Sequence, residues 1–164
     1  DLANATDVVH KKTPREQLYY ALEENTPRHY RAVAKYFPPT EAALNQHYGN
    51  LAQRYLAEYY RENGELEEAL TQYKALEDLG DASAEFTVSG LFGQARVLQL
   101  QDKSLAARSK LSQAHKVWQE IPQLQRSALL QSLDQELRQT FLEQLEIPDT
   151  GIIDAEARDT KNRD

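Results

Sequence analysis

The chain has 164 residues, of which 40% are hydrophobic and 27% charged, as is usual for a globular domain with its own core. The absence of Cys excludes disulfides, thiolate metal sites and thiol nucleophiles. The formal net charge of -7 disfavours nucleic-acid binding, which depends on an excess of Lys and Arg.

The beginning of the chain indicates a part of something larger. It starts at Asp1 and contains no Met, so we expect a processed chain or a segment of a longer protein. No apolar run approaches the roughly 20 residues of a membrane-spanning helix. We therefore expect a soluble segment without membrane insertion, either cytoplasmic or the extracytoplasmic part of a membrane-anchored protein.

Residues 1–12 lack periodicity and are expected to form a lead-in. Two Thr-Pro pairs follow, at Thr13 and Thr26, and each predicts a helix start because Thr caps a helix and Pro suits its first turn. Glu16 would complete a capping box. These signals predict helices over 14–24 and 27–37.

The Pro38-Pro39 pair ends the second helix, and Thr40 is predicted to cap a third that runs to about Asn63. Gly64 then provides the left-handed residue of a helix stop. A fourth apolar stripe, starting at Leu66, is closed by Gly80.

Asp81 or Ser83 is predicted to cap a fifth helix that runs to about Leu100, and Ser104 a sixth that runs through Trp118. A last helix is expected over 123–145, and the charged residues 148–164 are expected to be disordered. The sequence thus predicts an all-α protein of about seven helices.

The middle hairpin resembles a tetratricopeptide repeat, a unit of about 34 residues. Small residues at the crossing of the two helices let them approach closely, and larger side chains fill the space beside it. The resemblance rests on Leu56, Ala57, Tyr60, Gly64, Ala69 and Tyr73.

A weaker unit follows, with Ala107, Leu111 and Ala114 at the second-helix positions. Ala69 and Ala107 are 38 residues apart, so an insertion is expected in the linker 79–83. Gln94 stands where Leu is expected, which leaves the register of the helix over 84–101 open.

The resemblance implies a single domain over 13–147, built as a short solenoid of stacked helical hairpins. It would consist of an N-terminal hairpin (13–38), a clear repeat (40–80), a degenerate repeat (83–119) and a capping helix (122–146). The opening hairpin followed by a repeat also resembles segments of large bacterial membrane-anchored repeat proteins.

Members of this family bind partners on a concave surface formed by the first helix of each pair. The resemblance places Arg54, Glu58 and Arg61 on that surface in the clear repeat, and Phe92 and Arg96 in the weak one. Arg can grip a carboxylate with two hydrogen bonds, so an acidic peptide or a chain terminus is a candidate ligand.

No arrangement of residues predicts catalysis or a cofactor. The four His residues are far apart in sequence and form no metal-binding motif, and no phosphate-binding loop or nucleophile elbow is present. All nine Tyr residues lie between 19 and 73; we expect most to pack helices together, while Tyr55 or Tyr59 could line a groove.

Three functions remain open at this point. The leading hypothesis is a non-catalytic scaffold module that binds a protein or peptide, without metal, cofactor or nucleic acid. The second is a structural spacer or self-association domain of a larger, membrane-anchored or signalling protein, and a homo-oligomer is compatible with it. The third, an all-helical enzyme, would require a pocket with converging ionisable groups.

Overall fold

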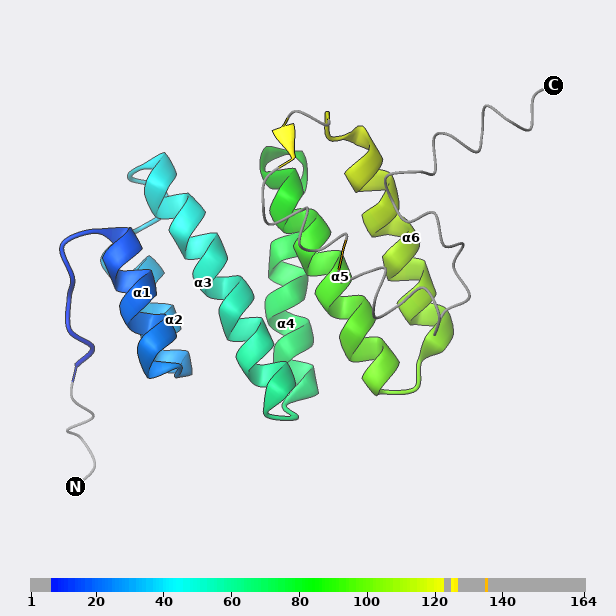
Figure 1. Ribbon diagram of the computed structural model, residues 1–164, viewed down its shortest axis with the longest axis horizontal. Coiled ribbons are helices and arrows are strands. Elements are labelled where there is room, and N and C mark those ends of the chain that lie inside the picture. Colours follow the sequence, from blue (N-terminus) through cyan, green and yellow to red (C-terminus); the bar gives the residue numbers. More distant parts are fainter. Residues whose placement is uncertain (1–6, 123–124, 127–134, 136–164) are drawn as a thin grey trace. The chain divides into compact units, whose positions relative to one another are not determined.

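The computed structural model of the chain describes residues 7–122, 125–126 and 135. This part is helical and contains no strand, which confirms the all-α prediction (Figure 1). It has six α-helices rather than about seven, because the predicted helix over 123–145 and the tail over 148–164 fall outside the described residues. The helices are α1 (Pro14–Glu24), α2 (Pro27–Tyr36), α3 (Ala43–Glu62), α4 (Leu66–Glu77), α5 (Ala84–Leu100) and α6 (Ser104–Glu120), with a short 3-10 helix, η1 (Gly80–Ser83), before α5.

The two Thr-Pro pairs begin α1 and α2 as predicted. The Thr13 hydroxyl accepts a hydrogen bond from the amide of Glu16 (3.1 Å), and the Thr26 hydroxyl accepts one from the amide of His29 (3.2 Å). The Glu16 carboxylate reaches back to the amide of Lys12 at 3.2 Å, one residue before the cap. Each helix start therefore satisfies backbone N–H groups that have no partner within the helix.

Two predicted caps are wrong. Helix α3 begins at Ala43 rather than beside Thr40, because a turn intervenes in which the Glu41 amide bonds to the Pro38 carbonyl (3.1 Å). Ser104 is the first residue of α6 rather than its cap, a position held by Lys103 without a side-chain hydrogen bond. In both cases the preceding turn determines where the helix begins.

Helices α3 and α5 end in the same way. After α3, Gly64 is left-handed (φ +75°), with the Glu65 amide bonded to the Tyr60 carbonyl (2.8 Å) and the Gly64 amide to that of Arg61 (3.1 Å). These two bonds define a Schellman motif.

After α5, Asp102 takes the left-handed place (φ 59°). The Lys103 amide bonds to the Leu98 carbonyl (2.9 Å), and the Asp102 amide to that of Gln99 (3.0 Å). Each turn connects its helix to the next one, α4 or α6, and the two left-handed residues lie 38 positions apart. The linker 79–83, in which an insertion was expected, contains the 3-10 helix η1.

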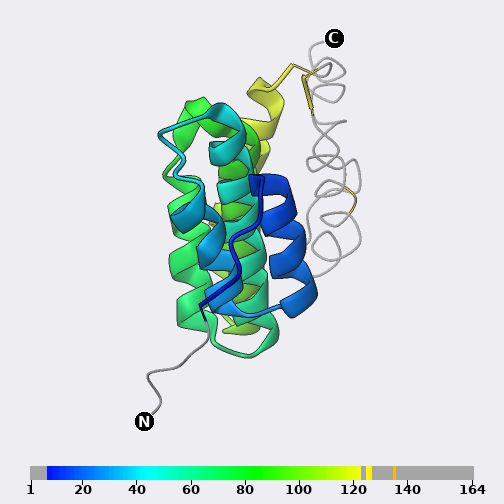
Figure 2. The same cartoon turned by 90° about the vertical axis from the view of Figure 1, so that its left-hand side faces the viewer.

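The chain divides into two compact units, residues 1–72 and 73–164, with the boundary inside α4. In the first unit α1, α2 and α3 contact one another around a buried core. Residues 7–12 lie against α1 and α2, on the side seen in Figure 2. The core side chains of this unit include Leu18, Ala21, Tyr30, Val33, Ala52 and Leu56.

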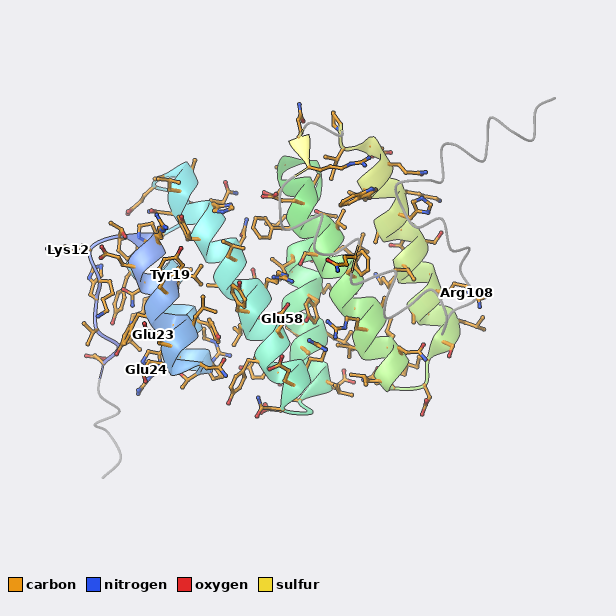
Figure 3. All side chains as sticks on the ribbon, in the orientation of Figure 1. Lys12, Tyr19, Glu23, Glu24, Glu58 and Arg108 are labelled. Atoms are coloured by element: carbon orange, nitrogen blue, oxygen red, sulfur yellow. The ribbon has the colours of Figure 1, made fainter. Side chains whose placement is uncertain are left out.

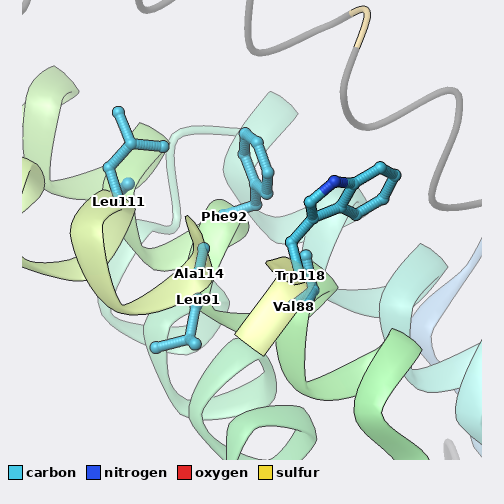
Figure 4. Close-up of a cluster of buried hydrophobic side chains, with 7 residues drawn as sticks. Val88, Leu91, Phe92, Leu111, Ala114 and Trp118 are labelled. Carbon is cyan, nitrogen blue, oxygen red and sulfur yellow. The ribbon is translucent and has the colours of Figure 1, made fainter. Parts of the chain in front are cut away.

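In the second unit α5 packs along α6, and the buried residues between them form an apolar cluster (Figure 4). Trp118 and Phe92 are the largest fully buried side chains of the described residues. The cluster consists of Val88, Leu91, Phe92, Ala95, Leu111, Ala114 and Trp118, with Val117 and Ile121 partly buried at its edge.

The residues that carry the repeat resemblance lie inside the two units. Ala57, Ala69, Ala107 and Ala114 are fully buried, and Leu56, Tyr60, Tyr73 and Leu111 are nearly so. Gln94 is buried as well, at the position where an apolar residue was expected. An offset of 38 residues therefore pairs buried with buried positions in both hairpins: Ala57 with Ala95, Ala69 with Ala107 and Tyr73 with Leu111.

Candidate partner-binding surface

Two of the three predicted groove residues of α3, Arg54 and Glu58, form an ion pair with each other. The Arg54 guanidinium lies 3.0 Å from the Glu58 carboxylate one helical turn away, and their side chains are 14% and 24% exposed. Figure 3 labels Glu58 on this helix. The positive charge of Arg54 is thus already balanced within α3. A partner could contact only the solvent-exposed parts of the Arg54 and Glu58 side chains.

Arg61 lies one turn further along α3 and is half-buried. Its Nε atom is buried and has no hydrogen-bond partner among the described residues. A buried N–H group of a cation usually has an acceptor, but this atom is closed to solvent, so a partner could contact Arg61 only through the exposed part of its side chain.

The two groove residues predicted on α5 lie in the second unit and differ in exposure. Phe92 is 1% exposed and belongs to the apolar cluster between α5 and α6, so its side chain presents no area to a partner here. The resemblance placed Phe92 on the concave surface, but the cluster that it forms with Trp118 and Leu111 buries it instead. Arg96, in contrast, is half-buried.

The tyrosines of the first unit mainly pack helices together. The rings of Tyr30 (α2) and Tyr55 (α3) are stacked, with centroids 6.3 Å apart, and the Tyr30 hydroxyl donates to the Asn25 side chain (2.8 Å). Burial, and then the negative charge of Glu58, raise the pKa of Tyr30. Tyr55 and Tyr59 are half-buried on α3, so both keep some area available to a ligand.

A pocket of about 230 Å³ lies between α2 and the segment that precedes α1. Arg28, Arg31 and Lys35 line it from α2, and all three are exposed. Buried Val8 and Ala32, together with half-buried Tyr36, supply its apolar part, and Asp7 is the only carboxylate among the described residues that line it. The lining therefore carries three positive charges and one negative charge.

Segment 7–12 is held in place by two side chains. The Tyr36 hydroxyl donates to the Val8 carbonyl (2.7 Å). The fully buried Gln17 donates to the Val9 carbonyl (2.9 Å) and accepts from the Lys11 amide (2.7 Å). One wall of the pocket is thus fixed by hydrogen bonds to α1 and α2.

This pocket was not predicted from the sequence, although one sequence signal for it is present. Helix α2 carries Arg28, Arg31 and Lys35 at steps of three and four and has no acidic residue. That spacing places the three cations along one side of the helix. The wall formed by Val8 could not be inferred, because residues 1–12 show no periodic pattern.

The ionisable groups that converge in the second unit stabilise the helices. Glu77 of α4 accepts hydrogen bonds from Gln94 of α5 (2.6 Å) and from the Lys110 ammonium of α6 (3.1 Å to each oxygen). Partial burial raises the pKa of the Glu77 carboxyl, but Gln94, Lys110 and Lys74 lower that pKa by more, so it lies below its usual value. The carboxylate stays charged at neutral pH and joins three helices.

The described residues contain no group of three or more His, Asp or Glu side chains that could hold a metal ion. Within the same ranges, no helix combines the length and apolar character needed to cross a bilayer. His10 stacks on Tyr36 (4.5 Å between ring centroids), and His29 is buried edge-on to Tyr20 (5.1 Å). These two histidines therefore pack against aromatic rings.

Comparisons with known proteins assign no family or function to this chain. No family model matches the chain, and neither the curated proteins nor the solved structures contain a significant match to it.

Proposed function

We propose that this chain is a non-catalytic helical module that binds a protein or peptide through the solvent-facing side of α3 in the first unit, and that the charged part of α5 provides a contact of its own in the second unit. Arg54, Glu58, Arg61 and Arg96 would provide polar contacts, and Tyr55 and Tyr59 apolar area. Tyr and Arg are enriched where protein interfaces gain most of their binding energy.

The repeated hairpin is the observation that carries this proposal. In two helix pairs the first helix ends in the same Schellman motif, and the two motifs lie 38 residues apart. Small residues at matching positions are buried in both pairs. In proteins built from repeated helix pairs, each pair packs against the next pair along the chain, and the stacked pairs form an extended binding surface. We also propose that the hairpins are tetratricopeptide-like repeats that stack as a short solenoid.

Site-specific cross-linking would test the proposal. A photoreactive amino acid in place of Tyr59, in the full chain expressed in its native cells, should trap a partner on irradiation. The same amino acid in place of Lys116, which is exposed on α6, serves as the matched control.

The purified partner should then bind the double variant Arg54→Glu with Arg96→Glu about tenfold more weakly than the unmodified chain. Exposed ion pairs contribute up to about 1 kcal/mol each, which is the size of this effect. Circular dichroism melting should show a folded protein with a small loss of stability, because Arg54→Glu replaces the ion pair with Glu58 by two like charges. Normal binding to the double variant would show that the surface assignment is wrong.

Self-association is the second candidate, favoured by two leucines beside the α5–α6 turn. Leu100 is 59% exposed and Leu105 is 83% exposed, and apolar side chains in such positions gain from burial against another copy. Light scattering over a range of concentrations would detect a dimer. A dimer that dissociates in Leu100→Ser with Leu105→Ser would favour the spacer function over partner binding.

A further inference from the structure

We propose that the pocket between α2 and segment 7–8 binds an extended acidic peptide of a partner protein. The peptide would carry two carboxylates about three residues apart, with an apolar side chain between them. The inference rests on the proposed partner-binding function and adds a second, separate contact surface with a stated ligand chemistry.

The charges of the pocket are complementary to carboxylates. Arg28, Arg31 and Lys35 contribute three positive charges and Asp7 one negative charge, a net of +2 on a chain whose formal net charge is -7. Like charges three and four residues apart weaken a helix. A row of cations without an acidic neighbour on α2 is therefore unfavourable for stability, and an anionic ligand would relieve the repulsion.

The dimensions favour a peptide. Arg28 and Lys35 are seven residues apart on α2, which corresponds to about 10 Å along the helix axis. Three residues of an extended chain span about the same length. The volume of about 230 Å³ is below the ~300–1,000 Å³ of pockets that enclose whole small molecules, and it suits one inserted side chain.

The inner part of the pocket is apolar and rigid. Val8, Ala32 and Tyr36 would contact the apolar side chain between the two carboxylates. The bonds from Tyr36 to Val8 and from Gln17 to the backbone of Val9 and Lys11 hold the wall in place before any ligand arrives. A preformed wall reduces the entropy lost on binding.

One cation has a partner that orients it. The Arg31 guanidinium donates to the Tyr60 hydroxyl of α3 (2.6 Å) through one Nη atom, and its remaining N–H groups are left for a carboxylate. Three cations are few for nucleic acid, where each phosphate contact adds to affinity and the net charge of -7 opposes approach. The apolar floor between the cations also favours a peptide over a phosphate chain.

Fluorescence anisotropy on the full chain at low salt would test the inference. The probe is a fluorescein-labelled peptide Gly-Ser-Glu-Leu-Val-Glu-Ser-Gly, and the control peptide has both Glu replaced by Gln. We expect the Glu peptide to bind at least tenfold more tightly than the Gln peptide. The variant Arg28→Gln with Lys35→Gln should weaken the Glu peptide at least tenfold, whereas Lys103→Gln with Lys116→Gln, with the same charge change in the second unit, should alter it less than twofold.

Several results would overturn the inference: no binding of the Glu peptide, equal binding of both peptides, or equal losses in the two double variants. Tighter binding of a mixed-sequence DNA duplex or of phosphatidylserine vesicles through Arg28 and Lys35 would assign the pocket to another class of ligand. A different experiment, cross-linking at Tyr59, tests the proposed function. If Tyr59 traps no partner while the Glu peptide binds, the pocket stands and the α3 surface is wrong.

Discussion

Gly93 of α5 lies directly against the aromatic ring of Tyr73 on α4. A Cβ atom added at residue 93 would overlap the ring carbons of Tyr73. At Gly90, one turn earlier, a Cβ atom would overlap the Tyr73 carbonyl and lie 2.6 Å from the Glu77 amide. The close packing of α5 against residues 73–77 therefore depends on two glycines.

We expect Gly93→Ala to destabilise the protein by about 1–3 kcal/mol, the usual cost of overpacking. This outcome reverses the ordinary trend, since Gly→Ala inside a helix normally stabilises by up to about 1 kcal/mol. Gly49 of α3 is the matched control, because a Cβ atom there would meet only Ala34, at 3.9 Å. Urea unfolding should show a gain for Gly49→Ala and a loss for Gly93→Ala; a gain in both would contradict the close contact.

The Glu77–Lys110 pair should make stability depend on pH. The folded pKa of Glu77 is lowered, so its contribution is present above the unfolded value of about 4.3 and is lost as pH falls through the lower folded value. Lys110→Met should cost about 1 kcal/mol at pH 7 and progressively less at pH 3 and below. Urea unfolding of Lys116→Met, an exposed lysine on the same helix, is the control, and an equal, pH-independent loss in both variants would rule out the pair.

The two left-handed positions predict changes of opposite sign. Gly64→Ala should destabilise by about 1 kcal/mol, because a Cβ atom is disfavoured at a φ of +75°. Asp102→Gly should stabilise by about 0.5 kcal/mol, because Gly adopts a φ of 59° without that strain. Thermal melting of both variants would check this, and a loss of stability in Asp102→Gly would indicate that the Asp102 side chain stabilises the turn.

Gln17 should be required for the order of segment 7–12. Gln17→Leu would leave the Val9 carbonyl and the Lys11 amide without their partner, at a cost of about 1–3 kcal/mol. Hydrogen exchange of the Lys11 amide should become much faster, while the amides in the middle of α3 should be unaffected. The exposed Glu23 on α1, labelled in Figure 3, provides the control Glu23→Gln, and slow exchange at Lys11 in Gln17→Leu would refute the role of this bond.

Local signals in the sequence determined most of the helices. Thr13 and Thr26 placed two helix starts, and Gly64 placed a helix end, because caps and stops act on backbone groups within a few residues. The recurrence of apolar residues at steps of three and four, together with the abundance of helix-forming residues, was enough to predict the all-α class. Thr40 and Ser104 failed as caps because a Thr or Ser before an apolar stripe indicates only the neighbourhood of a helix start.

Positions that depend on distant parts of the chain were decided by the tertiary structure alone. The resemblance placed Phe92 on a binding surface, whereas the structure buries it in the apolar cluster with Trp118 and Leu111. Gln94 could be buried because Glu77, 17 residues earlier, accepts its amide hydrogen bond. The wall of the basic pocket depends on Gln17 and Tyr36 bonding to residues 8–11, which carry no pattern of their own. Sequence periodicity reports which side of a helix is apolar, whereas burial and pocket shape depend on which other segment covers that side.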